Sequence, residues 1–193
     1  MDVVGAIRNL NLFDLLVAFF VFGFFVAGFI QGTVRRLIGL GILVVAILLA
    51  INLRDPFGSW LAGYWVQFPK AYSTMLAFGA SFIVIYLAGS ILVQVFYRRT
   101  TLFKRSTLAD EVIGGLLGIL QSVLLVGILI TILDSFYRIP GVEPSSNELG
   151  ILHDIYRAYD PSQTAIIFRD TLIPAFLALF AWITPAALRD FFG

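Results

Sequence analysis

The chain contains no cysteine, only one histidine and few charged residues, since Lys, Arg, Asp and Glu make up 13% of its 193 residues. Without cysteine it has no disulfide framework, no thiolate nucleophile and no thiolate metal site. The charged fraction is about half of that in an average soluble domain, whereas 60% of the residues are hydrophobic. Water is therefore an unfavourable solvent for this chain. Its net charge of +1 also gives no polybasic surface, which argues against nucleic acid as a partner.

The chain has long uncharged apolar runs instead. A hydrocarbon core of about 30 Å requires about 20 helical residues at a rise of about 1.5 Å each. Four runs satisfy this requirement, and a fifth contains two prolines. The runs are residues 15–34, 37–53, 71–97, 112–133 and 171–188. We therefore predict an all-α integral membrane protein with four transmembrane helices plus a C-terminal apolar helix, which is re-entrant, packed on the bundle or a fifth span.

Turn and capping residues predict where these helices begin and end. Asn11 is expected to cap the first helix, and the second is expected to end near Asn52, because Arg54-Asp55-Pro56 follows. The aromatic residues within 57–68 then predict a short interfacial helix, and 148–159 a small surface helix. The predicted domains are a four-helix membrane domain (1–134), a polar extracytoplasmic segment (135–170) and the C-terminal apolar helix (171–193).

Basic residues predict the orientation of the chain in the membrane. Six lie in the connections between helices one and two and between helices three and four, and three lie on the opposite side. An excess of Lys and Arg marks the cytoplasmic side, so both connections are expected to be cytoplasmic and the N-terminus outside. The same side chains are expected to attract anionic lipid headgroups. They are Arg35, Arg36, Arg98, Arg99, Lys104 and Arg105.

Small residues recur at a spacing of four in two of the predicted helices. Gly28 and Gly32 end the first helix, and Gly114 and Gly118 lie near the start of the fourth. Glycines at this spacing allow two helix backbones to approach closely in a membrane. They predict packing within one bundle, with homo-oligomerisation as the alternative.

Two acidic residues occur near predicted helix starts. Asp14 follows Asn11 at the spacing of a cap, whereas an intramembrane carboxylate is also a candidate for proton or ion handling. Asp110 follows Thr107 at the same spacing, which predicts a capping box at the start of helix four. His153 has Asp154 and serines nearby, but no nucleophile-elbow pattern accompanies it. We therefore predict no catalytic, cofactor-binding or metal-binding residues.

The order of these motifs resembles the CvpA, or colicin V production protein, family. The resemblance covers about residues 12–133 and rests on Asp14, the sequence Gly-Phe-Ile-Gln-Gly-Thr-Val-Arg-Arg at 28–36, and Asp-Glu-Val-Ile-Gly-Gly-Leu-Leu-Gly at 110–118. It implies a bacterial four-span inner-membrane protein linked to colicin V production or export and to the cell envelope. In some relatives a similar module anchors an extracytoplasmic serine protease. Glu111 departs from the pattern, because the family usually has a basic residue there.

Three functional hypotheses follow. The first is a non-enzymatic CvpA-like factor for toxin production or export or for envelope homeostasis. The second is a small proton-linked transporter or channel subunit that depends on Asp14, and the third is a membrane scaffold for an extracytoplasmic partner such as a protease. The candidate functional residues are Asp14, Gly28, Gly32, Arg35, Arg36, Asp110, Gly114 and Gly118.

Overall fold

The structure is a computed structural model that describes residues 11–96, 107–138 and 149–179. Contacts within the chain divide it into two units, which we describe separately. The terminal unit comprises Met1–Val17 and Gly150–Gly193, and the bundle unit comprises Ala18–Leu149. The divisions predicted at residues 134 and 170 stay a prediction.

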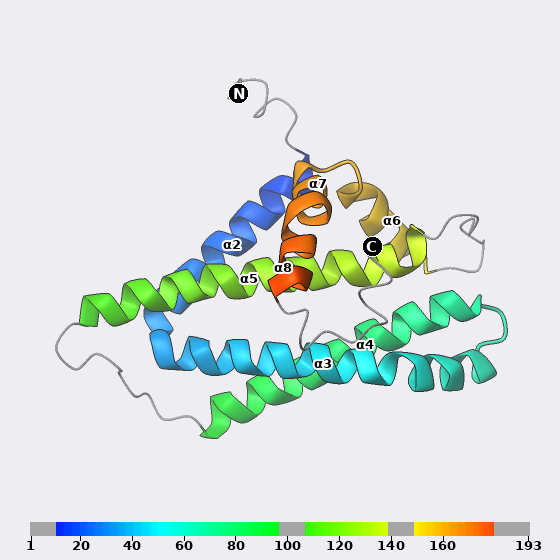
Figure 1. The fold of residues 1–193 in the computed structure, drawn as a ribbon, viewed down its shortest axis with the longest axis horizontal. Coiled ribbons are helices and arrows are strands. Elements are labelled where there is room, and N and C mark those ends of the chain that lie inside the picture. The colour runs from blue at the N-terminus through cyan, green and yellow to red at the C-terminus, as the bar shows by residue number, and fades with distance from the viewer. Residues whose placement is uncertain (1–10, 97–106, 139–148, 180–193) are drawn as a thin grey trace. The chain divides into compact units, whose positions relative to one another are not determined.

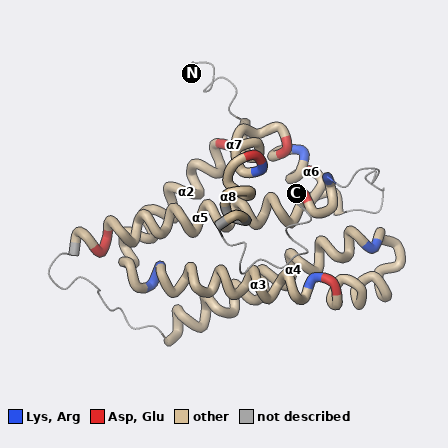
Figure 2. The backbone as a smooth tube through the Cα atoms, viewed as in Figure 1, with Lys and Arg blue, Asp and Glu red and all other residues tan. Residues whose placement is uncertain are grey.

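Four long helices form the elements that the apolar runs predicted. They are α2 (Leu12–Gln31), α3 (Thr33–Tyr64), α4 (Lys70–Phe96) and α5 (Thr107–Tyr137). Each is long and apolar enough to cross a membrane, which confirms the prediction of an all-helical fold with four candidate spans. Figure 2 shows long uncharged stretches along these helices, with few charged positions between them.

Helix α3 differs from the prediction, because it continues through Pro56 to Tyr64 instead of ending near Asn52. The predicted break and the separate interfacial helix after it are therefore wrong. Proline removes one backbone hydrogen bond, at a cost of about 3 kcal/mol or more inside a helix. Packing beyond it favours continuation: an ideal Cβ on Gly58 would lie 2.8 Å from the Thr74 Cα atom of α4. The rings of Trp60 and Tyr64 also lie 5.0 Å apart along the extended helix.

Helices α3 and α4 run antiparallel and side by side in the bundle unit (Figure 1). Ala46 and Ala50, both fully buried, pack with Leu43, Phe78 and Phe82 in the core. Small side chains at these α3 positions allow the neighbouring helices to approach. Partly buried residues of α5 cover the same core, including Leu124 and Ile128.

The described part of the terminal unit contains the start of α2 and four short elements. These are α6 (Gly150–Tyr159), α7 (Gln163–Ile167), a π-helical turn η1 (Phe168–Leu172) and α8 (Ile173–Leu179). Helix α6 agrees with the predicted surface helix. The π-turn ends two residues before Pro174, whose missing N–H cannot bond the carbonyl four residues earlier. The described C-terminal helix has seven residues, and the second half of the run predicted as a possible fifth span, from residue 180 onward, lies outside the described residues.

Candidate functional site

The turn between α2 and α3 depends on Gly32. Its φ angle of 80° is the only positive value among the described residues, and its N–H donates to the Gly28 carbonyl at 2.9 Å. L-residues other than glycine rarely adopt this conformation, because the Cβ atom crowds the backbone. Gly32 therefore allows α3 to follow α2 with only one residue between the two helices.

Glycines bring the backbones of α2 and α5 into direct contact. An ideal Cβ on Gly28 would meet the Gly114 carbonyl oxygen, and one on Gly118 would meet the Phe24 carbonyl oxygen. A Cβ on Gly114 would lie 2.8 Å from the Gly32 carbonyl carbon. The predicted glycine pairs thus pack against each other within one chain, as the first of the two interpretations proposed.

Asp110 links the start of α3 to α5. Its Oδ1 atom accepts the Thr33 N–H at 3.4 Å, and the Thr33 hydroxyl donates to the Asp110 carbonyl at 2.9 Å. Both residues are buried. Asp110 was predicted to cap its own helix with Thr107, whose side chain is outside the described part. The described hydrogen bond instead satisfies a free amide at the start of α3, where a negative charge is favourable.

The Arg36 side chain lies in the interior of the bundle unit. The prediction that it lies at the membrane surface, where it would contact lipid headgroups, is therefore wrong. Only 7% of its surface is exposed. Its Nη1 atom donates to Gln121 Oε1 at 2.7 Å, and Gln121 Nε2 donates to the Tyr86 hydroxyl at 2.8 Å. The guanidinium carbon lies 5.3 Å from the centre of the Phe24 ring, a favourable cation–π arrangement.

The Arg36 Nε atom is buried without a hydrogen-bond partner among the described residues. Arg36 also forms no ion pair in that part of the chain. Arg35 beside it is partly exposed. The other four basic residues expected at headgroups, Arg98, Arg99, Lys104 and Arg105, lie outside the described residues.

Asp14 belongs to the terminal unit and is also buried, with 6% of its surface exposed. Its carboxylate accepts three backbone N–H groups: from Asn11 at 2.9 Å, from Thr164 at 2.8 Å and from Gln163 at 3.3 Å. The Asn11 bond is one half of the predicted capping arrangement. The other two bonds cap the start of α7, so Asp14 connects the first turn of α2 to a segment about 150 residues later.

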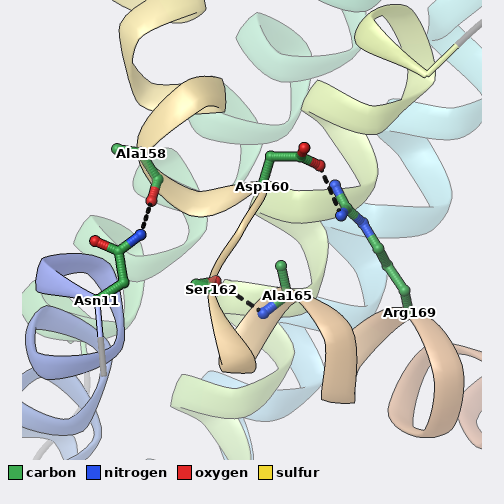
Figure 3. Close-up of polar contacts among 6 residues, drawn as sticks. All are labelled: Asn11, Ala158, Asp160, Ser162, Ala165 and Arg169. Carbon is green, nitrogen blue, oxygen red and sulfur yellow. Dashed lines mark hydrogen bonds and ion pairs between the residues drawn. The ribbon is translucent and has the colours of Figure 1, made fainter. Parts of the chain in front are cut away.

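Figure 3 shows three further polar contacts in the terminal unit. The Asn11 side chain donates to the Ala158 carbonyl at 2.6 Å, and Ser162 Oγ accepts the Ala165 N–H at 3.0 Å. Arg169 forms an ion pair with Asp160 at 2.8 Å. The first contact joins the start of α2 to α6, the second caps α7, and the third connects the turn between α6 and α7 to η1.

In the bundle unit, six of the eight candidate residues lie where α2, α3 and α5 meet. The glycines make backbone contacts there, and Asp110 caps the start of α3. Arg36 begins a buried series of hydrogen bonds through Gln121 to Tyr86. Among the described residues, no three His, Cys, Asp or Glu side chains lie close enough together to hold a metal ion. The partner residues were not predicted from the sequence: Gln121, Tyr86 and Thr33 in the bundle unit, and Gln163 and Thr164 in the terminal unit. Gln121 had a recognisable signal, because it is a polar residue inside an uncharged run.

Comparison with known families gives one match. The model of the family described as colicin V production protein matches residues 13–149. The matched segment includes Asp14 and every candidate residue of the bundle unit. No curated protein and no solved structure matches the chain.

Proposed function

The chain belongs to the colicin V production protein family, and we propose that it is a non-enzymatic factor of the bacterial inner membrane. In this proposal it supports the production or export of a colicin V-type toxin, or maintains the cell envelope. Its multi-pass membrane character follows from the family and from the four long apolar helices. Family membership alone does not establish a catalytic activity.

The proposal is supported by the contacts of the candidate residues in the bundle unit, which are structural contacts between helices. Gly28, Gly114 and Gly118 are occupied by contacts between helix backbones, and Asp110 by a hydrogen bond to Thr33. Residues engaged in this way fix the shape of a helical bundle. A rigid membrane component that acts through other proteins or the bilayer requires that shape, whereas chemistry at these positions would require groups free to react.

Deletion and complementation test the proposed role. A strain that makes a colicin V-type toxin should release less active toxin, or become more sensitive to detergent, when this chain is removed. Wild-type protein and Gly23→Val should restore the lost property, because a Cβ on Gly23 meets no atom within 4 Å. Gly118→Val should fail to restore it. Unchanged toxin release and unchanged detergent sensitivity in the deletion strain would contradict the proposal.

Proton-linked transport is the second candidate, supported by the two buried ionisable side chains Asp14 and Arg36. Purified protein in liposomes with an imposed pH gradient separates the two proposals. A non-transporting factor gives the same proton flux as protein-free liposomes. A flux that Asp14→Asn abolishes, while the variant keeps wild-type helicity and melting behaviour, would favour transport instead.

The scaffold hypothesis differs in requiring a protein partner. Photocrosslinking from exposed positions of α6, such as Arg157, is the direct test in cells. A specific crosslinked protein that is retained by Asp14→Asn would support the scaffold. A chain that yields no crosslinked partner and purifies as a monomer would contradict it.

The proposed orientation places the N-terminus outside the cytoplasm. Because the chain has no native cysteine, single cysteines report topology without background labelling. Val66→Cys lies at an exposed position in the turn between α3 and α4. It should react with a membrane-impermeant maleimide in intact spheroplasts, whereas Lys104→Cys should react only after lysis. The reverse pattern would invert the orientation.

A further inference from the structure

Helix α6 exposes an apolar stripe. Ile151 and Ile155 are one helical turn apart on the same face, and 69% and 37% of their respective surfaces are exposed. Arg157 is also exposed and lies on the opposite side of the helix, whereas the exposed Asp154, three residues after Ile151, borders the stripe on its polar side. A ten-residue helix with apolar and charged sides has the pattern of an element that lies along a membrane surface.

The C-terminal end of α6, one turn beyond Ile155, is attached to the beginning of α2. Tyr159 is fully buried, and its ring centre lies 5.5 Å from that of Phe13. The Asn11 side chain donates to the Ala158 carbonyl at 2.6 Å. These contacts, all within the terminal unit, fix the C-terminal end of α6 beside the first turn of α2.

The length of α2 indicates the depth in the membrane at which α6 is attached to it. Its 20 residues extend about 30 Å at about 1.5 Å per residue, which equals the thickness of the hydrocarbon core. The first turn of α2 therefore lies at the boundary between acyl chains and headgroups. Asp14 binds the first amides of α7 at the same end of α2, so two separate connections bring the segment after residue 149 to this boundary.

We propose that α6 lies in the lipid–water interface, with Ile151 and Ile155 inserted between the lipids at the end of α2. The bilayer is the occupant of the stripe because α6 is attached to a membrane-spanning helix at the depth where the hydrocarbon begins. Asp154 and Arg157 remain in the headgroup and water layer. The segment predicted as polar and extracytoplasmic thus contains a membrane-surface anchor.

Site-directed spin labelling tests this placement. Ile151→Cys, Ile155→Cys and the matched control Arg157→Cys are each labelled in the full chain, which is then placed in phosphatidylcholine–phosphatidylglycerol nanodiscs. Collision rates are measured with oxygen, which concentrates in lipid, and with a water-soluble nickel chelate. Labels at 151 and 155 should collide more with oxygen, at a depth of about 5–10 Å, whereas the label at 157 should collide more with nickel.

Two results would overturn the proposal. Nickel collisions at 151 and 155 that equal those at 157 would place the stripe in water. Protection of 151 and 155 from both reagents would mean that protein, such as a second copy of the chain, covers the stripe instead of lipid. Circular dichroism of each labelled variant, compared with the unlabelled protein, verifies that the helices are intact.

Discussion

Asp14 and Asp110 are both buried carboxylates in the first turn of a long apolar helix, and each accepts a backbone N–H from the start of another helix. They differ in what surrounds that bond. Asp14 accepts three N–H groups at 2.8–3.3 Å, whereas Asp110 accepts one at 3.4 Å beside Gly32 and Gly114. At Asp14, hydrogen bonds therefore connect the start of α2 to α7 within the terminal unit. At Asp110, close packing of the backbone contributes more than the single hydrogen bond to the α2–α3 turn.

The largest effect is expected where backbone packing is most restrictive. Gly118→Val would place side-chain atoms against the Phe24 carbonyl oxygen, and a backbone carbonyl cannot move aside without bending α2. We expect a loss of more than about 3 kcal/mol in unfolding free energy, because overpacking a tight contact commonly costs about 1–3 kcal/mol even where side chains can adjust. Unfolding in mixed micelles, monitored by tryptophan fluorescence, measures the loss. A matched Gly23→Val variant should remain close to wild type, and equal losses in the two variants would contradict the packing argument.

The next effect concerns the buried guanidinium of Arg36. Gln121→Leu removes its charged hydrogen bond, and we expect a loss of about 1.5–3 kcal/mol. Arg36→Met leaves Gln121 Oε1 without its donor, at about 1–3 kcal/mol, but it also removes the desolvation penalty of the buried charge, so its loss should be smaller than that in Gln121→Leu. The double variant should recover most of the stability lost in Gln121→Leu, and Tyr86→Phe measures the remaining bond of Gln121 separately. A loss in Arg36→Met as large as that in Gln121→Leu would show that the charge itself stabilises the bundle.

The two carboxylates can be compared directly by truncation. Asp14→Ala leaves three N–H groups without their acceptor, so we expect a loss of about 1–3 kcal/mol. Asp110→Ala removes one long bond and should cost about 0.5–2 kcal/mol, as for other helix caps. Hydrogen exchange locates each effect: the amides of Gln163 and Thr164 should exchange faster in the first variant, and that of Thr33 in the second. Faster exchange of all three amides in both variants would mean that the two sites are coupled.

Sequence was sufficient for the four long helices, because each uncharged run has the length that a bilayer requires. It was misleading at Pro56, where a local rule about proline was outweighed by contacts of Gly58 with Thr74. Thr74 belongs to the next helix, more than ten residues after Gly58, so a local sequence pattern cannot predict this contact. Gly28, Gly114 and Gly118 were correctly assigned to packing, since their spacing alone specifies a smooth helix face.

The partners of the two carboxylates could not be predicted in the same way. Thr33 lies 77 residues from Asp110 and Thr164 lies 150 residues from Asp14. Helix-start spacing indicated that each carboxylate would cap a helix, and the structure shows that each caps a distant helix as well as, or instead of, its own. The choice depends on which helix starts the fold brings together, and that is determined by the packing of whole helices.

A third carboxylate gives the smallest expected effect and sharpens the contrast with Asp14. Asp160 pairs with Arg169 at 2.8 Å in the same unit, but 43% of its side chain is exposed. Solvent screens such a pair, so we expect Asp160→Asn to cost about 0–1 kcal/mol at low salt. The cost should disappear near 1 M salt, where the Debye length is about 3 Å. Arg169 also lies over the Tyr159 ring at 5.4 Å, and this contact remains in the variant.

Unfolding measured at both salt concentrations tests the prediction. A loss above about 1 kcal/mol that salt does not change would mean that Asp160, like Asp14, acts as a buried group whose partners water cannot replace.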